Sequence, residues 1–180
     1  MAAATPGHIV IRPLSVGRFA DVYDIDMREH GDIVYRVVDG HLRADPEERD
    51  RPPRTREEWN RHIDEWVEML QAGGQAWGAY ETQSRMVGII VLRRHLTDEM
   101  DQLAALFVSR DYRRAGIARR LTELLIATAR AAGARRLYVS ATPSRSAVGF
   151  YRSQGFELAR AVHPDLFARE PEDIHMILEL

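Results

Sequence analysis

The sequence contains no cysteine and no lysine, so all 25 of its basic residues are arginines. Without cysteine the chain has no disulfide, no thiolate metal ligand and no cysteine nucleophile. Without lysine it has neither the phosphate-binding lysine of a P-loop nor a Schiff-base amine. The longest apolar run, residues 86–92, is too short to cross a bilayer. These absences exclude several enzyme classes and predict no membrane partner.

The length of 180 residues, with 45% hydrophobic and 29% charged side chains, predicts one globular domain over residues 1–180. The first seven residues lack the basic and apolar regions of a signal peptide. We therefore expect a cytoplasmic protein. None of the seven histidines has the spacing of a metal-ligand pair, which predicts no metal site.

The net charge of −2 hides an uneven distribution. Residues 103–152 contain ten arginines but only two acidic residues, Asp111 and Glu123. This basic block indicates either a local anionic ligand or an arginine-rich solvated surface. The rest of the chain is acidic and would repel a long polyanion, so no nucleic-acid partner is predicted.

Apolar periodicity and turn residues predict the secondary structure. A capping box, Thr55 with Glu58, marks the clearest helix. Helices are expected at 15–27, 55–71, from 115 to Gly133 and from 143 to Gly155. Strands are expected at 8–14, 75–83, 86–96, 102–109, 137–141, 156–162 and 173–180, with a turn at Ser84-Arg85. Residues 32–54, rich in proline and charge, are expected to be mostly loop. The strand–helix–strand run over 103–141 predicts a βαβ unit.

The most informative segment is residues 108–118, between a strand and an amphipathic helix. A helix N-terminus has unpaired amides and a partial positive charge, which together favour a phosphate. Gly116 and Ala118 permit close approach of a ligand, and Arg113 and Arg114 are able to bind phosphate oxygens. The alternative is an ordinary strand–helix turn, but the basic block favours the anion site.

These residues resemble the signature of the GNAT superfamily of N-acetyltransferases: Gln or Arg, two residues, Gly, one residue, then Gly or Ala. Here it is Arg113-x-x-Gly116-x-Ala118. Residues 147–156 are similar to the family's Ala…Phe-Tyr…Gly-Phe segment, and residues 8–14 to its first strand. The resemblance is strong over 103–156 and weak over 24–72. It implies an α+β fold: a mixed, mostly antiparallel central sheet flanked by about four helices, with a βαβ acyl-CoA cradle.

The resemblance also implies that acetyl-CoA is the donor substrate, with its pyrophosphate on the amides of 113–118 and its pantetheine arm along the preceding strand. It assigns cofactor binding to Leu106, Phe107, Val108, Arg113, Arg114, Ala115, Gly116, Ile117, Ala118, Ser144 and Tyr151. Ser144 stands where many relatives carry Asn, and it is also suited to cap a helix. Tyr151 matches the family's catalytic proton donor to the departing thiolate; the alternative is a packed core tyrosine.

The general base is not evident. Many relatives carry a glutamate on the strand before the cradle, but here Leu103, Ala104 and Ala105 occupy that stretch. Glu99 and Asp101 are the candidates just upstream. We expect no single carboxylate to be indispensable and the amine to lose its proton through water.

The implied reaction is direct acetyl transfer, in a ternary complex, to a primary amine of a small molecule or peptide. Transfer from another acyl-CoA and a non-catalytic acyl-CoA-binding module are the alternatives, and a homodimer is left open. Acidic residues crowd the segment expected to line the acceptor cleft: Asp21, Asp24, Asp26, Glu29 and Asp32. They indicate either an acidic rim that attracts a cationic amine or a solvated face paired with Arg18 and Arg28.

Overall fold

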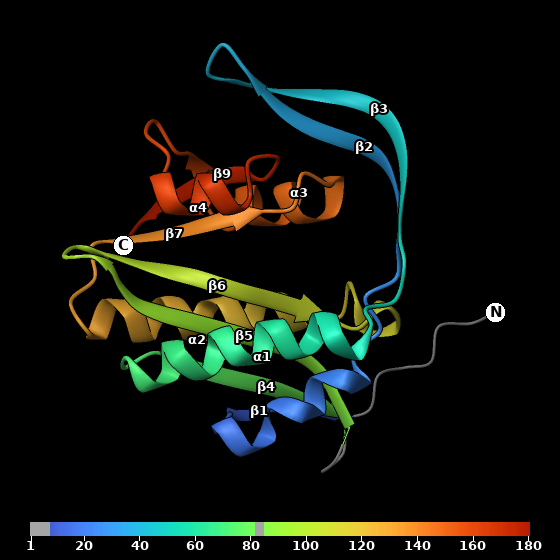
Figure 1. Cartoon of the computed structure of the whole chain (residues 1–180), viewed down its shortest axis with the longest axis vertical. Helices are drawn as coiled ribbons and strands as arrows, with labels where there is room; N and C mark the ends of the chain where they lie inside the picture. The colour runs from blue at the N-terminus through green and yellow to red at the C-terminus, as the bar shows by residue number, and fades with distance from the viewer. Residues whose placement is uncertain (1–7, 82–84) are drawn as a thin grey trace.

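The computed structural model describes residues 8–81 and 85–180. A seven-stranded sheet with the order β1-β4-β5-β6-β7-β9-β8 organises the chain (Figure 1). Its strands are β1 (Ile9–Pro13), β4 (Gln75–Glu81), β5 (Arg85–Thr97), β6 (Met100–Val108), β7 (Arg136–Ala141), β8 (Glu157–Leu158) and β9 (Ile174–Glu179). The helices are α1 (Arg56–Gln71), α2 (Ile117–Ala131), α3 (Arg145–Ser153) and α4 (Pro164–Arg169), with 3₁₀ turns η1 (Val16–Asp24) and η2 (Arg110–Tyr112).

Both faces of the sheet are covered, and β5 shows why. Ile89 and Val91 point to the face covered by η1 and α1, whereas Ile90 and Leu92 point to the face covered by α2 and α3. All four side chains are fully buried. A strand that is apolar at every position is typical of one buried on both faces. The predicted α+β fold is confirmed, with antiparallel pairing everywhere in this sheet except between β6 and β7.

The parallel pair β6–β7, joined by α2, is the predicted βαβ unit. Its ladder is short. Residues 100–102 of β6 pair with residues 136–138 of β7, and the two strands then separate toward their carboxyl ends. Residues 103–108 keep β5 as a partner on the other side. The sheet therefore opens at the end where α2 and α3 begin.

The prediction of a loop over 32–54 is wrong. This segment forms most of a long antiparallel hairpin, β2 (Glu29–Val38) with β3 (His41–Arg51). Asp39 and Gly40 have φ values of 50° and 75°, the backbone of a tight two-residue hairpin turn. Cross-strand charge pairs replace the apolar alternation that a strand usually shows. Arg36 donates to Asp45 at 2.9 Å and to Glu47 at 2.5 Å.

The hairpin is a separate two-stranded sheet that arches over the edge of the molecule carrying α3 and β9 (Figure 1). The amide of Tyr35 donates to the Pro143 carbonyl at 2.8 Å. At its other strand, Arg49 lies 3.6 Å from the carboxylate of Glu172. These contacts fix the hairpin against the loops that precede α3 and β9.

Two other predicted elements differ in the structure. The segment expected to be a helix at 15–27 is the 3₁₀ helix η1, and the closing strand expected at 156–162 is reduced to Glu157–Leu158. The unpredicted α4 follows, with Pro164 at its first position, where a missing amide hydrogen costs nothing. Ser84, in the predicted turn, lies outside the described residues. No helix in the described part of the chain is long and apolar enough to span a bilayer.

The capping box of α1 is confirmed. The Glu58 amide donates to the Thr55 hydroxyl at 3.2 Å, and the Thr55 amide donates to the Glu58 carboxylate at 2.7 Å. We expect Thr55→Ala to lower the free energy of unfolding by about 1 kcal/mol, because the first turn loses a cap. Urea denaturation measures the change. Thr97→Ala, the same change at an exposed strand end, is the control and should cost clearly less.

Candidate active site

A cavity of about 880 Å³ lies where β6 and β7 separate. Residues 103–108 of β6 form one wall, and the start of α2, α3 and the base of the β2–β3 hairpin form the others. Of the residues predicted to bind the cofactor, those that line the cavity are Leu106, Phe107, Val108, Arg113, Arg114, Gly116, Ile117, Ala118, Ser144 and Tyr151. Ala115 is not among them. The structure thus brings together residues from β6, from the start of α2 and the segment before it, and from α3 with its N-cap.

The start of α2 is open toward this cavity. Gly116 is the N-cap, with φ 76° in the left-handed region, and it has no side chain to cap the first amides. A Cβ added at Gly116 would meet no protein atom within 4 Å, so protein packing does not require glycine here. Ile117 and Ala118 follow along the cavity wall. The uncapped amides and the helix dipole form an anion site that suits a pyrophosphate.

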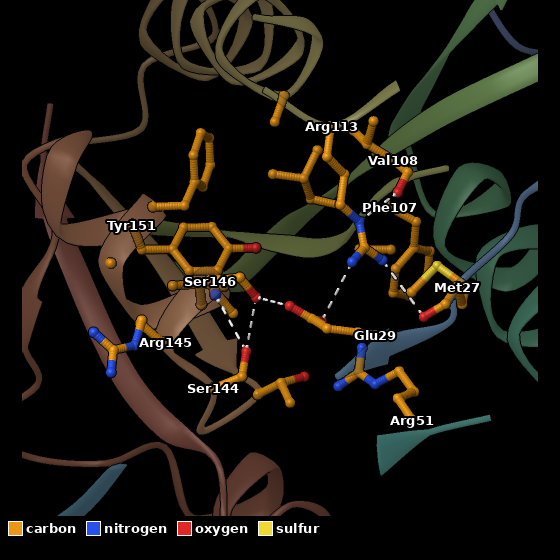
Figure 2. Close-up of a pocket in the computed structure, with 18 of the residues that line it drawn as sticks. Met27, Glu29, Arg51, Phe107, Val108, Arg113, Ser144, Arg145, Ser146 and Tyr151 are labelled. Carbon is orange, nitrogen blue, oxygen red and sulfur yellow. Dashed lines mark hydrogen bonds and ion pairs between the residues drawn. The ribbon is translucent and has the colours of Figure 1, made fainter. Parts of the chain in front are cut away.

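Arg113 differs from the expectation that its side chain faces a phosphate. Its Nε donates to the Val108 carbonyl at 3.2 Å and one terminal nitrogen to the Met27 carbonyl at 3.4 Å. The other lies 3.7 Å from Glu29 (Figure 2). Arg113 therefore joins β6 to β2 inside the cavity. Arg114 is exposed and has a positive φ of 65°, so of the two arginines of the motif it is the one available to an anion.

Tyr151 on α3 belongs to both the core and the cavity. Its ring packs edge-on against Phe150 and Phe156, and only 7% of the residue is exposed. Its hydroxyl points toward the centre of the cavity, with Arg113 and Glu29 opposite (Figure 2). Burial raises the pKa of Tyr151, and the charge of Asp173 raises it further. The phenol therefore holds its proton until strong negative charge develops beside it.

Ser144 acts as a helix cap. Its hydroxyl accepts from the Ala147 amide at 3.2 Å at the start of α3. Its hydroxyl also lies 3.1 Å from that of Ser146, which in turn donates to Glu29 (Figure 2). Ser144 thus lines the cavity and caps the helix at once.

The two carboxylates considered as bases from sequence lie elsewhere. Glu99 pairs with Arg135 at 3.1 Å, and buried Asp101 pairs with Arg94 at 2.8 Å. Neither lines the cavity. Asp173, just before β9, does line it and was missed because no motif surrounds it. Burial, with the nearby charge of Glu170, raises the pKa of Asp173 to about 6.

The acidic residues of 21–32 are largely neutralised by arginines. The pairs are Arg18–Asp21 and Arg28–Asp26 at 2.6 Å, Arg145–Asp32 at 3.0 Å and Arg113–Glu29 at 3.7 Å. The first two are the pairs expected for a solvated face. Within residues 8–81 and 85–180, no group of three or more His, Asp or Glu is placed to hold a metal ion.

The fold and the open cradle define a domain of the acyl-CoA-binding type. Residues 44–179 match the family model of the acetyltransferase (GNAT) domain, so the chain belongs to the GNAT family of acyl-CoA-dependent transferases. No curated protein matches the sequence.

Solved structures share the fold. Nourseothricin acetyltransferase has a TM-score of 0.74 at 19% identity, covering 95% of this chain and 98% of that one. A GNAT-family acetyltransferase from Staphylococcus aureus Mu50 has a TM-score of 0.69 at 20% identity, covering 96% and 99%. A GNAT-family acetyltransferase from Elizabethkingia anophelis, solved with acetyl-CoA bound, has a TM-score of 0.58 at 16% identity, covering 96% and 98%.

The cradle predicts the effect of a change at Gly116. Gly116→Glu places an anionic side chain in the space that a pyrophosphate needs, so we expect loss of measurable CoA binding by calorimetry. Gly133→Glu is the matched control. Gly133 also has a positive φ, 88°, and open space around its Cβ, but it lies at the far end of α2. Equal CoA affinity of the two variants would contradict the cradle.

The raised pKa of Asp173 predicts a pH-dependent stability. The folded state binds this proton more tightly than the unfolded chain, so the stabilisation is present at low pH and lost as pH rises through about 6. Asp173→Asn should therefore stabilise the protein by about 2 kcal/mol above pH 7 and by little near pH 4. Urea unfolding across this range measures it, with the exposed-site variant Asp98→Asn as control. A gain that is independent of pH would show that the carboxylate charge is not the cause.

Proposed function

We propose that the protein is an N-acetyltransferase that moves the acetyl group of acetyl-CoA directly to a primary amine in a ternary complex. The observation that carries this proposal is the shared cavity: the uncapped start of α2, the separated edge of β6 and the Tyr151 hydroxyl all border it. These three features match the three parts of acetyl-CoA. The start of α2 suits the diphosphate, the edge of β6 suits the extended arm with its amides, and the Tyr151 hydroxyl suits the thiol leaving group.

In this reaction acetyl-CoA supplies an activated acetyl group as a thioester. The amides at the start of α2 hold the pyrophosphate, and β6 at Leu106–Val108 guides the pantetheine arm toward Tyr151. The amine nitrogen forms a bond to the carbonyl carbon, and the carbon–sulfur bond breaks. Tyr151 gives its proton to the departing sulfur. Because burial raises the pKa of its phenol, Tyr151 keeps this proton until negative charge develops on the sulfur atom.

The acceptor amine is mostly protonated at neutral pH and must lose a proton before it attacks. The carboxylates that border the cavity are Glu29, Asp32, Glu170 and Asp173. Glu29 and Asp32 are held by arginines. We propose that the proton leaves through water in the cavity, with Asp173 as the carboxylate best able to receive it above pH 6.

A screen of primary amines with acetyl-CoA, read by thiol release, tests the proposed activity. Turnover of at least one amine is the expected outcome. Tight CoA binding without thiol release on any amine would contradict transfer and favour a non-catalytic acyl-CoA-binding module.

Tyr151→Phe keeps the packed ring and removes the proton. We expect kcat to fall by about 10²–10⁴-fold, the usual contribution of a general acid, with CoA affinity nearly unchanged. Steady-state kinetics and calorimetry measure the two quantities. Tyr138→Phe removes a hydroxyl from a buried strand residue that does not line the cavity, and it should keep kcat. A Tyr151→Phe enzyme with normal kcat would return Tyr151 to a packing role.

A further inference from the structure

Two arginines, Arg51 and Arg54, border the cavity and come from one short segment. Arg51 ends β3, Pro52 and Pro53 follow, and Thr55 caps α1. Proline fixes its own φ and restricts the residue before it to extended backbone. The segment therefore limits the backbone conformations available between the two arginines.

The two differ from Arg113 and Arg145 in the same cavity because, among the described residues, neither is within ion-pair distance of a carboxylate, although the charge of Glu58 acts on Arg54 and that of Arg51 acts on Asp173. Arg113 and Arg145 are paired with Glu29 and Asp32. In the described part of the chain, Arg51 forms no hydrogen bond or ion pair, although it is the cross-strand neighbour of Glu29 (Figure 2). The Glu29 carboxylate is instead occupied by Arg113 and Ser146.

Arg54 is held among aromatic rings. Its guanidinium lies 5.1 Å from the ring centre of Trp59 and 5.0 Å from that of Phe107, and it donates to His62. Burial and the charge of Arg54 lower the pKa of His62 to about 4, so the imidazole is neutral and accepts this bond. Burial and the positive charge of Arg51 both lower the pKa of Arg54. The two half-buried cations thus repel each other, and the charge of Glu58 offsets this only in part for Arg54.

Phe107 places this pair close to the reaction centre, since it neighbours Leu106 and Val108, where the pantetheine arm is proposed to run. Carboxylates Glu170 and Asp173 border the same cavity. The charge of Arg51 acts on Asp173, and the charge of Asp173 acts in turn on the Tyr151 phenol. The cavity therefore offers cations for an anionic group and a carboxylate for an ammonium group.

We propose, on the basis of the proposed N-acetyl transfer, that Arg51 and Arg54 form a carboxylate-binding subsite and that the acceptor is an amine of the amino-acid class. A carboxylate accepts two parallel bonds from a guanidinium and removes the repulsion between the pair. The acceptor's ammonium group then lies toward Asp173 and loses its proton there. The paired acidic residues Asp21, Asp26, Glu29 and Asp32 do not select the acceptor, because arginines neutralise them.

To test this subsite, each common amino acid is incubated with the enzyme and acetyl-CoA, once as the free acid and once with its α-carboxylate replaced by a primary carboxamide. Thiol release is measured in each case. The carboxamide has the less basic amine, so amine reactivity alone favours it. We expect the free acid of the preferred acceptor to have a kcat/KM about 10- to 100-fold higher than its carboxamide, the effect of one or two charged hydrogen bonds.

The variants Arg51→Gln and Arg54→Gln should each raise KM for the free acid and abolish the preference, with smaller changes in kcat and for the carboxamide. Arg43→Gln, the same charge change on β3 but outside the cavity, is the matched control and should keep the preference. CoA affinity, measured by calorimetry, should be the same in all four proteins, because the pair binds the acceptor and not a phosphate of CoA.

Three results would overturn the subsite. The first is turnover of the carboxamide as fast as that of the free acid. The second is an Arg51→Gln or Arg54→Gln enzyme that keeps the preference for the free acid. The third is weaker CoA binding by either variant. Any of these leaves N-acetyl transfer standing if thiol is still released. Absence of thiol release with every acid, carboxamide and simple amine overturns the proposed function itself, and this inference with it.

Discussion

The site depends on one interruption of strand pairing, the separation of β6 from β7 after residues 102 and 138. Because the two strands are parallel, their carboxyl ends lie at the same edge, and the helices that follow them, α2 and α3, begin there too. Buried backbone groups must find a partner, so the edge of β6 that β7 leaves is matched to a ligand with its own amides. An unbroken ladder would close the cavity and leave the start of α2 without a ligand to face.

Signals carried by adjacent residues were predictable from the sequence. The capping box of α1, the βαβ unit and the start of α2 at Gly116 depend on neighbours within one turn or one loop, and the structure has each where it was expected. The hairpin β2–β3 was missed because its strands are matched by charge across the ladder, as between Arg36 and Asp45, so neither strand shows apolar alternation. Its turn signal, Asp39-Gly40, was visible and follows the largely apolar run 33–38, but residues 41–51 after it are mostly charged and do not resemble a strand.

Features that need two distant segments were not predictable. Asp173 and Arg51 border one cavity although 121 intervening positions separate them, and no spacing rule joins them. The direction of the Arg113 side chain was also out of reach. The motif places its backbone at the cradle, but the carbonyls of Met27 and Val108 determine where its guanidinium lies. The net charge of residues 21–32 likewise did not predict whether these acids form an acidic rim, because some of their arginine partners come from residues beyond 110.

The separate two-stranded sheet of β2 and β3 has a consequence for how this protein diverges from its relatives. The hairpin shares no ladder with the seven-stranded sheet, so its length and charge are free to change without disturbing the strands that hold the cradle. Its last residue is nevertheless part of the cavity wall. A change in the hairpin can therefore reshape one wall of the cavity while every strand of the seven-stranded sheet keeps its partners.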